Sequence, residues 1–332
     1  MKYDSQSRSS LGYALIVLLA VFFCTGCAAL NEAQQRRQER VKNERKERHV
    51  LYERPTSDFS ATPDGLTVNS EHYTLTFDET LLQHEDYDEA QERQDTGRGI
   101  LVSLESLYNF VYDILKFEPN YRIEVVLHPP SRGRTHAAVT SSGAQIMLDG
   151  GELIKQVTSA RIHFPLNMMQ QKGTQAHELT HAFTEIYNIP SWFAEGLSVL
   201  VEVEYVKQGY FGKIDIENDI RVNADGVNMV QNWSSGTIGV PALTKWRYDY
   251  SYSLVSKLKS RFGEDFYAKV FRLIEKEKFH EKTLERMSTS VLVYFLSQVA
   301  GEDLTPFFEK LKFNVRSLTK SEILSIIGPS PQ

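Results

Sequence analysis

One pentapeptide restricts the possible folds more than any other part of the sequence: His177-Glu178-Leu179-Thr180-His181. Four residues advance an α-helix by about 400°, so His177 and His181 project from one face, one turn apart. Two imidazoles placed in this way can bind one Zn²⁺ at about 2.0–2.1 Å. Glu178 lies about 100° further round the helix, where its carboxylate can act as a general base without binding the metal. The motif therefore predicts a helix with a zinc site on one face.

A second motif, PSWFAEGLS, occupies residues 190–198. Pro190 and Ser191 end the first helix and begin another. Glu195 falls 14 residues after His181, and so short a connection returns the second helix against the first, where Glu195 can supply a third ligand. Two histidines and one carboxylate leave a fourth position for water, which is typical of catalytic zinc sites. We therefore expect one Zn²⁺ ion at this helix pair.

The two segments, HELTHAF and PSWFAEGLS, resemble the gluzincins, the thermolysin-like zinc metallopeptidases, and most closely their peptidase MA-type members. The resemblance implies that His177, His181 and Glu195 are zinc ligands and that Glu178 is the general base. It also implies a fold of the thermolysin-like zincin type. The chain has no G-x-M-E-N segment like that of the aminopeptidase branch, which argues against a strict exopeptidase.

Enzymes of this superfamily often stabilise the tetrahedral oxyanion with a downstream Tyr or His, and family-like spacing favours Tyr248 for that role. Tyr250 and Tyr252 stay as alternatives, since three tyrosines at alternating positions can equally pack against the core. Glu185, four residues beyond His181, is a candidate for orienting a ligand. A solvated helix residue is the favoured interpretation of Glu185.

Hydrophobic periodicity predicts an α+β fold with a small α/β lobe ahead of the zinc motif and a mainly helical lobe after it. Strands are predicted at 66–77 and 122–128, with an amphipathic helix between them at 100–117. A further short strand is predicted at 144–148, and its edge is a candidate for pairing with an extended peptide. A buried edge strand without ligand contact is the alternative. Beyond Lys172, helical periodicity fits 173–187, 191–204, 251–262, 266–278, 289–299 and 304–313.

The N-terminus has the pattern of an exported lipoprotein. The apolar run from Leu11 to Phe23 would cover only about 20 Å as a helix, short of the roughly 30 Å hydrocarbon core, which suits a signal peptide. Small residues before Cys27 resemble the lipobox of bacterial lipoproteins, in which the cysteine is acylated. By the same resemblance to Gram-negative lipoproteins, Ala28 implies an outer-membrane location facing the periplasm. An ordinary signal peptide with an incidental cysteine is the alternative.

Charge and cysteine content exclude several classes. The net charge is −6, so bulk attraction to nucleic acid is not expected. Only two cysteines occur, both within the first 30 residues, which excludes a disulfide scaffold and a cysteine-rich zinc ribbon. Residues 31–54 lack Gly and Pro and are dominated by charged and polar residues, so they are interpreted as a solvated spacer or, alternatively, a segment that touches lipid headgroups or peptidoglycan.

The predicted divisions are a signal peptide at 1–26, a charged tether at 27–65, an N-terminal α/β lobe at 66–171, a zinc-binding helix pair at 172–205 and a mainly helical C-terminal lobe at 206–332.

The leading hypothesis is a zinc-dependent endopeptidase, anchored to the membrane by lipid, that cleaves peptide or protein substrates in the cell envelope. Zinc would make a water molecule more acidic, and Glu178 would take its proton and return it to the leaving amine. One alternative is a non-catalytic envelope lipoprotein with a structural or relic zinc site. Another is a zinc amidase that acts on peptidoglycan. The sequence carries no prediction of oligomeric state.

Overall fold

The computed structural model describes residues 59–83, 89–129, 139–149, 152–207, 211–233, 241–283 and 285–326. All described residues belong to one compact unit, residues 55–332. The predicted signal peptide, Cys27 and most of the predicted tether lie outside the described residues.

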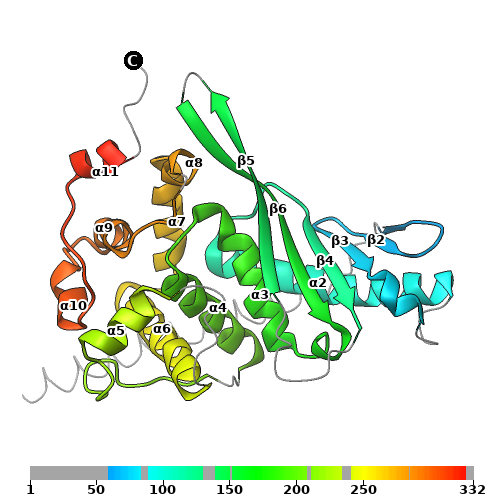
Figure 1. The fold of residues 1–332 in the computed structure, drawn as a ribbon, viewed down its shortest axis with the longest axis horizontal. Coiled ribbons are helices and arrows are strands. Elements are labelled where there is room, and N and C mark those ends of the chain that lie inside the picture. Colours follow the sequence, from blue (N-terminus) through cyan, green and yellow to red (C-terminus); the bar gives the residue numbers. More distant parts are fainter. Residues whose placement is uncertain are drawn as a thin grey trace, which may run out of the picture. The chain divides into compact units, whose positions relative to one another are not determined.

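A six-stranded mixed sheet forms the first half of the described chain (Figure 1). The central strands β3 (Tyr73–Phe77), β4 (Ile123–His128) and β6 (Glu152–Pro165) run parallel, and helix α2 (Ala90–Leu115) makes the crossover from β3 to β4. The remaining pairings are antiparallel. The sheet order is β1-β2-β3-β4-β6-β5, with β1 at Ser60–Ala61, β2 at Thr67–Asn69 and β5 at Val139–Asp149.

Alternating side chains bury one face of this sheet. In β4 the residues Ile123, Val125 and Leu127 are buried while the residues between them are half-buried, which is the period-two pattern expected of a strand covered on one side. The apolar stripe of α2 is also buried, as the sequence predicts. The helix begins at Ala90, ten residues before the predicted start. The predicted strand–helix–strand order is present with a longer helix, but the single strand predicted at 66–77 is two antiparallel strands, β2 and β3.

The strand predicted at 144–148 is longer than expected. It belongs to the eleven-residue strand β5, which pairs with the fourteen-residue strand β6, a strand that the sequence analysis did not predict. Figure 1 shows this hairpin extending beyond the other strands. β6 alternates clearly only from Ala160 to Phe164, and a register shift at Gly143 and Ala144 interrupts the pairing. Because the first half of β6 lacks regular alternation, hydrophobic periodicity does not reveal this strand in the sequence.

Helices dominate from Lys172 onward, as predicted. Helix α3 (Lys172–Thr184) packs against the sheet on one side and against α4 (Ser191–Val206) on the other, and α4 packs against α6 (Pro241–Phe262). The other helices are α5 (Ala224–Gln231), α7 (Phe266–Lys276), α8 (Phe279–Lys282), α9 (Thr289–Ala300), α10 (Thr305–Lys310) and α11 (Lys320–Ile326). Within the described ranges, every helix is too short or too polar to cross a bilayer.

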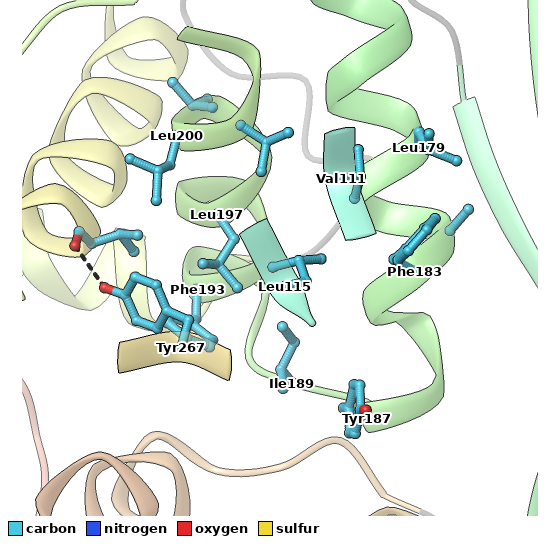
Figure 2. Close-up of a cluster of buried hydrophobic side chains, with 14 of the residues drawn as sticks. Val111, Leu115, Leu179, Phe183, Tyr187, Ile189, Phe193, Leu197, Leu200 and Tyr267 are labelled. Carbon is cyan, nitrogen blue, oxygen red and sulfur yellow. Dashed lines mark hydrogen bonds between the residues drawn. The ribbon is translucent and has the colours of Figure 1, made fainter. Parts of the chain in front are cut away.

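A buried apolar cluster holds α3 and α4 in place. Figure 2 shows Leu115 of α2, Phe183 of α3 and Leu197 of α4 meeting in this cluster, where all three side chains are fully buried. The hydroxyl of Tyr267 donates a 2.6 Å hydrogen bond to the carbonyl of Val255, which ties α7 to α6 beneath it. Burial of this kind contributes about 1.5–3 kcal/mol per large apolar side chain. The two helices that carry the zinc motif are thus fixed by the core.

Candidate metal centre

Three side chains on α3 and α4 converge as a compact triangle. The Nε2 atoms of His177 and His181 are 3.2 Å apart, and Oε2 of Glu195 lies 3.2 Å from the first and 3.3 Å from the second. All three side chains are half-buried. This group is the one set of three or more His, Cys, Asp or Glu ligands among the described residues that can hold a metal ion.

The size of the triangle fits a zinc ion. With bonds of about 2.0–2.1 Å, the ligand atoms of a tetrahedral zinc site lie about 3.3 Å from one another. The three observed separations of 3.2–3.3 Å match that value. A donor set of two imidazoles and one carboxylate also matches the ligands that zinc prefers and leaves the fourth position open. The residues present therefore fit zinc.

The turn between α3 and α4 brings Glu195 back to the histidines. After the short 3-10 helix Glu185–Tyr187, Asn188 adopts the left-handed conformation with φ of 50°, and its carbonyl accepts a hydrogen bond from the amide of Met287. At the start of α4, the indole of Trp192 donates a 3.2 Å hydrogen bond to Thr289. These contacts anchor the turn to the segment that leads into α9.

A glycine next to Glu195 lets α4 approach α6 closely. A Cβ atom at Gly196 would lie 2.7 Å from the carbonyl oxygen of Ser251 and 2.7 Å from a methyl of Val255. Since real Cβ contacts are not that short, any larger residue would force the two helices apart. Gly196 therefore sets the depth at which Glu195 sits.

Glu202 contacts the far side of His177 and is not among the site residues predicted from the sequence. Its Oε2 atom lies 3.3 Å from Nδ1 of His177, which leaves Nε2 of that ring to face the triangle. Glu202 follows Glu195 by seven residues, two helical turns on, so the spacing itself placed it on the same face of α4. Gly173 leaves room for it, because a Cβ there would meet the Glu202 side chain at 3.2 Å.

The ionisable groups of the triangle shift one another's pKa values. Burial acts to lower the pKa of His177, but hydrogen bonds to Glu195 and Glu202 outweigh it and raise that pKa to about 10. Burial acts in the opposite sense on Glu195, and the two histidines hold its pKa well below the usual range. Metal ligands must be deprotonated, so metal binding here must release a proton from the site.

Glu178 lies beside the triangle, as its position in the motif predicts, and strand β5 supports it. The side chain is only 7% exposed, and the hydroxyl of Thr140 donates a 2.8 Å hydrogen bond to its Oε2 atom. Burial raises the pKa of Glu178 above its usual range, although His177 and His181 act against that shift. A raised pKa favours a carboxylate that accepts and then returns a proton.

Of the three candidate tyrosines, Tyr248 is the one whose ring contacts a histidine of the triangle. Its centroid lies 6.0 Å from that of His177, and its other neighbours include the rings of Phe211 and Trp233. Burial, together with the charges of Glu195 and Glu178, raises its pKa, so the hydroxyl stays protonated. Tyr250 and Tyr252 are buried in the core. The tyrosines lie on a helix and not in an alternating segment, because α6 begins at residue 241 and not at the predicted 251.

Glu185 does not orient a triangle residue through any hydrogen bond in the described structure. Its Oε1 atom accepts a 2.8 Å hydrogen bond from the hydroxyl of Ser142 on β5. The carboxylate that contacts a triangle histidine is that of Glu202. The favoured interpretation of Glu185 as a helix-surface residue is closer to the structure than the ligand-orienting one.

A histidine pair and a glutamate around an open metal position, with a buried carboxylate on the adjacent residue, define the site class of a metallopeptidase. The sequence pattern of one family, described as peptidase M60, enhancin and enhancin-like, matches residues 140–312, just over half of the chain. The chain belongs to this family. Thr140, Glu202 and Tyr248 lie within the matched range together with the triangle. No curated protein matches the chain significantly.

Proposed function

We propose that this chain is a zinc-dependent endopeptidase of the gluzincin type, with a thermolysin-like arrangement of its lobes, that hydrolyses peptide bonds in the cell envelope. The observation that carries the proposal is the triangle of two imidazole nitrogens and one carboxylate oxygen, with separations of 3.2–3.3 Å. Membership of a metallopeptidase family supports the hydrolytic part of the proposal.

The residues around the triangle suit peptide hydrolysis. A bound zinc supplies Lewis-acid chemistry, because it polarises a carbonyl and makes a water molecule more acidic. Glu178 takes the proton of the attacking water and delivers it to the leaving amine, and Thr140 keeps its carboxylate oriented for both transfers. The hydroxyl of Tyr248 donates a hydrogen bond to the oxyanion that develops on the scissile carbonyl.

The outer edge of β5 is proposed as the place where the peptide lies. β5 is the last strand in the sheet order, so one row of its backbone groups has no neighbouring strand among the described residues. Thr140 near one end of this strand contacts Glu178 directly. An extended peptide that pairs with β5 would therefore pass the catalytic carboxylate, as in β-strand addition.

The envelope location is proposed from the sequence of the N-terminus. The apolar run at 11–23 and the small residues ahead of Cys27 support export, acylation of Cys27 and anchoring in the outer membrane, with the catalytic unit facing the periplasm. Labelling cells with a radioactive fatty acid tests this part: the wild-type chain should become labelled and a Cys27→Ser variant should not.

Metal analysis paired with Glu178→Gln tests the enzymatic part. The purified chain should contain one zinc per molecule and cleave unfolded protein, and Glu178→Gln should keep its zinc yet lose cleavage. Full activity in that variant would refute the role of Glu178 as base. Zinc binding without any hydrolysis by the wild type would favour a structural or relic site. Release of muropeptide fragments with intact protein substrates would favour a peptidoglycan amidase.

A further inference from the structure

Arg247 is a buried cation that has no ion-pair partner among the described residues. The residue is 7% exposed, and its Nε atom is enclosed and has no hydrogen-bond partner. Among the described residues, no carboxylate or carbonyl accepts a hydrogen bond from the guanidinium. Among the guanidinium nitrogens only Nε is both enclosed and without a partner, and Arg247 has no further hydrogen bond within the described part of the chain, so its two terminal nitrogens keep some exposed surface. A buried charge is costly to maintain unless it is paired.

Aromatic contacts connect Arg247 to the metal triangle. Its guanidinium lies over the ring of Trp233, with 4.7 Å from the central carbon to the centroid. The ring of Tyr248 meets Trp233 edge-on at 4.7 Å and lies 6.0 Å from His177. Since an extended peptide advances about 3.3 Å per residue, this path of contacts places Arg247 within about five residues of a bond held at the triangle.

Neighbouring cations in the same part of the fold are paired. Arg221 also lies over a tryptophan, Trp246, but it makes two hydrogen bonds of 2.9 and 2.7 Å to the carboxylate of Asp219. Lys245 makes contacts of 2.9 and 2.7 Å with Asp249, one turn along α6. Stacking on tryptophan therefore does not account for the missing counter-charge of Arg247.

We propose that Arg247 binds a carboxylate of the peptide substrate, so that the site prefers peptides with an Asp or Glu side chain, or a free C-terminus, a few residues from the scissile bond. This inference rests on the proposed peptidase function. A guanidinium suits the role because its planar fork matches the two oxygens of a carboxylate and is held flat by an aromatic ring. The acidic group would supply the ion-pair partner that Arg247 does not find among the described residues.

Direct peptide binding tests the proposal independently of turnover. The full chain with Glu178→Gln, loaded with zinc, is titrated against octapeptides of Ala and Ser that carry an uncharged fluorophore and a C-terminal amide. One Glu is moved along the series, and a matching series carries Gln. Fluorescence anisotropy should show binding about tenfold tighter for Glu than for Gln at one or two neighbouring positions.

A third set of peptides distinguishes an acidic side chain from a free C-terminus as the source of the carboxylate. These peptides have no acidic residue, and their free C-terminal carboxylate lies at varied distances from the middle of the peptide. Tighter binding in this set alone would assign Arg247 to the substrate's C-terminus. Tighter binding in the Glu series alone would assign it to an acidic side chain. Equal binding of all three sets would overturn the proposal.

Arg247→Met should remove the preference for Glu while binding of the Gln peptides stays within about twofold, and Arg247→Lys should keep part of it because the charge remains without the fork. Arg221→Met is the matched control, since it removes a stacked arginine that is already paired with a carboxylate.

If Arg247→Met weakens binding of the Glu and Gln peptides equally, Arg247 only packs against Trp233 and the proposal fails. If Arg247→Met does not fold, the proposal is tested by comparing the preference for Glu over Gln peptides in the wild type and in Arg247→Lys. Cleavage of neutral peptides by the wild type tests the proposed function separately.

Discussion

Nδ1 of His177 lies 3.3 Å from Oε2 of Glu202, so a carboxylate two turns along α4 supports the first histidine of the triangle from behind. An Nδ1–H that donates to this carboxylate fixes the tautomer in which Nε2 is free to bind metal. Glu195 on the same helix contacts Nε2 of the same ring. Helix α4 thus carries both the predicted ligand, Glu195, and the residue that orients His177, Glu202.

Replacing Glu202 should weaken metal binding without abolishing the fold. Glu202→Leu removes the acceptor for Nδ1, and we expect zinc affinity to fall by about 10- to 100-fold, the effect typical of lost outer contacts to a ligating histidine. Zinc retained at graded chelator concentrations measures the change. Glu204→Gln is the control, because Glu204 lies on the same helix and pairs with Lys259. An unchanged zinc affinity in Glu202→Leu would show that the contact has no part in metal binding.

Thr140 should matter for turnover and not for metal content. Thr140→Val keeps the side-chain shape but removes the hydroxyl that donates to Glu178. Because a hydrogen bond to a charged group contributes about 1.5–3 kcal/mol, we expect kcat to fall by about tenfold or more while zinc stoichiometry stays at one. Thr140→Ser keeps the donor and should stay close to wild type. A Thr140→Val enzyme with normal kcat would mean that Glu178 is positioned by its helix alone.

The metal triangle could be predicted because it depends on local geometry. The positions of His177 and His181 follow from the pitch of a helix, and Glu195 follows from a short turn. The contact of Thr140 with Glu178 is different, because it joins β5 to α3 across 38 residues and depends on a hairpin that the sequence pattern did not show. Glu202 follows Glu195 by seven residues, so its spacing alone places it on the same face of α4, whereas the residue predicted to orient a ligand was Glu185, four residues beyond His181.

The tyrosines show a second limit of sequence patterns. Positions 248, 250 and 252 alternate like a strand, yet they lie on the helix α6, where successive alternate positions point 200° apart. The helix therefore turns Tyr248 toward His177 and buries Tyr250 between Trp246 and Phe313. Periodicity alone could not choose among them, because the start of α6 depends on tertiary packing.

Tyr248→Phe should lower kcat and leave zinc affinity unchanged. The hydroxyl is expected to act only on charge that develops during the reaction, so its loss costs about 10²-fold in kcat with little change in KM. Steady-state kinetics on an unfolded protein substrate measures both constants. Tyr250→Phe serves as the control: its hydroxyl is enclosed without a partner among the described residues, so activity should persist and stability should hold or rise. Equal losses in the two variants would remove Tyr248 from the mechanism.

The unit formed by residues 55–332 should lose stability in acid, partly because the carboxylate of Glu105 becomes protonated. The backbone amide of His72 donates a 2.9 Å hydrogen bond to this buried carboxylate, and Nδ1 of His72 lies 2.6 Å from its other oxygen. Burial acts to raise the pKa of Glu105, but its hydrogen bonds with His72 outweigh burial and hold the pKa below its usual range. A carboxyl with a lowered folded pKa stabilises the fold above its unfolded pKa, and that contribution is lost as the pH falls through the folded value.

Glu105→Gln should therefore cost about 2 kcal/mol of unfolding free energy at pH 7 and progressively less below pH 4.5. Urea denaturation of wild type and variant at pH 7 and at pH 3.5 gives the comparison. Glu92→Gln is the control, since Glu92 is exposed in the first turn of the same helix. A difference between wild type and Glu105→Gln that is as large at pH 3.5 as at pH 7 would contradict the assignment of this stability to the ionised carboxylate.

Gly196→Ala should damage both the fold and the metal centre. The added Cβ would meet the backbone of Ser251 and a methyl of Val255 at 2.7 Å, so α4 must move away from α6. Such overpacking costs about 1–3 kcal/mol, and the displacement carries the adjacent Glu195 with it. Thermal unfolding and zinc retention should therefore fall together. Gly99→Ala in α2 meets nothing within 4 Å and should instead stabilise the chain by about 0.5–1 kcal/mol through helix propensity. If Gly196→Ala lost stability but kept its zinc affinity, the close packing of α4 against α6 would not be needed to position Glu195.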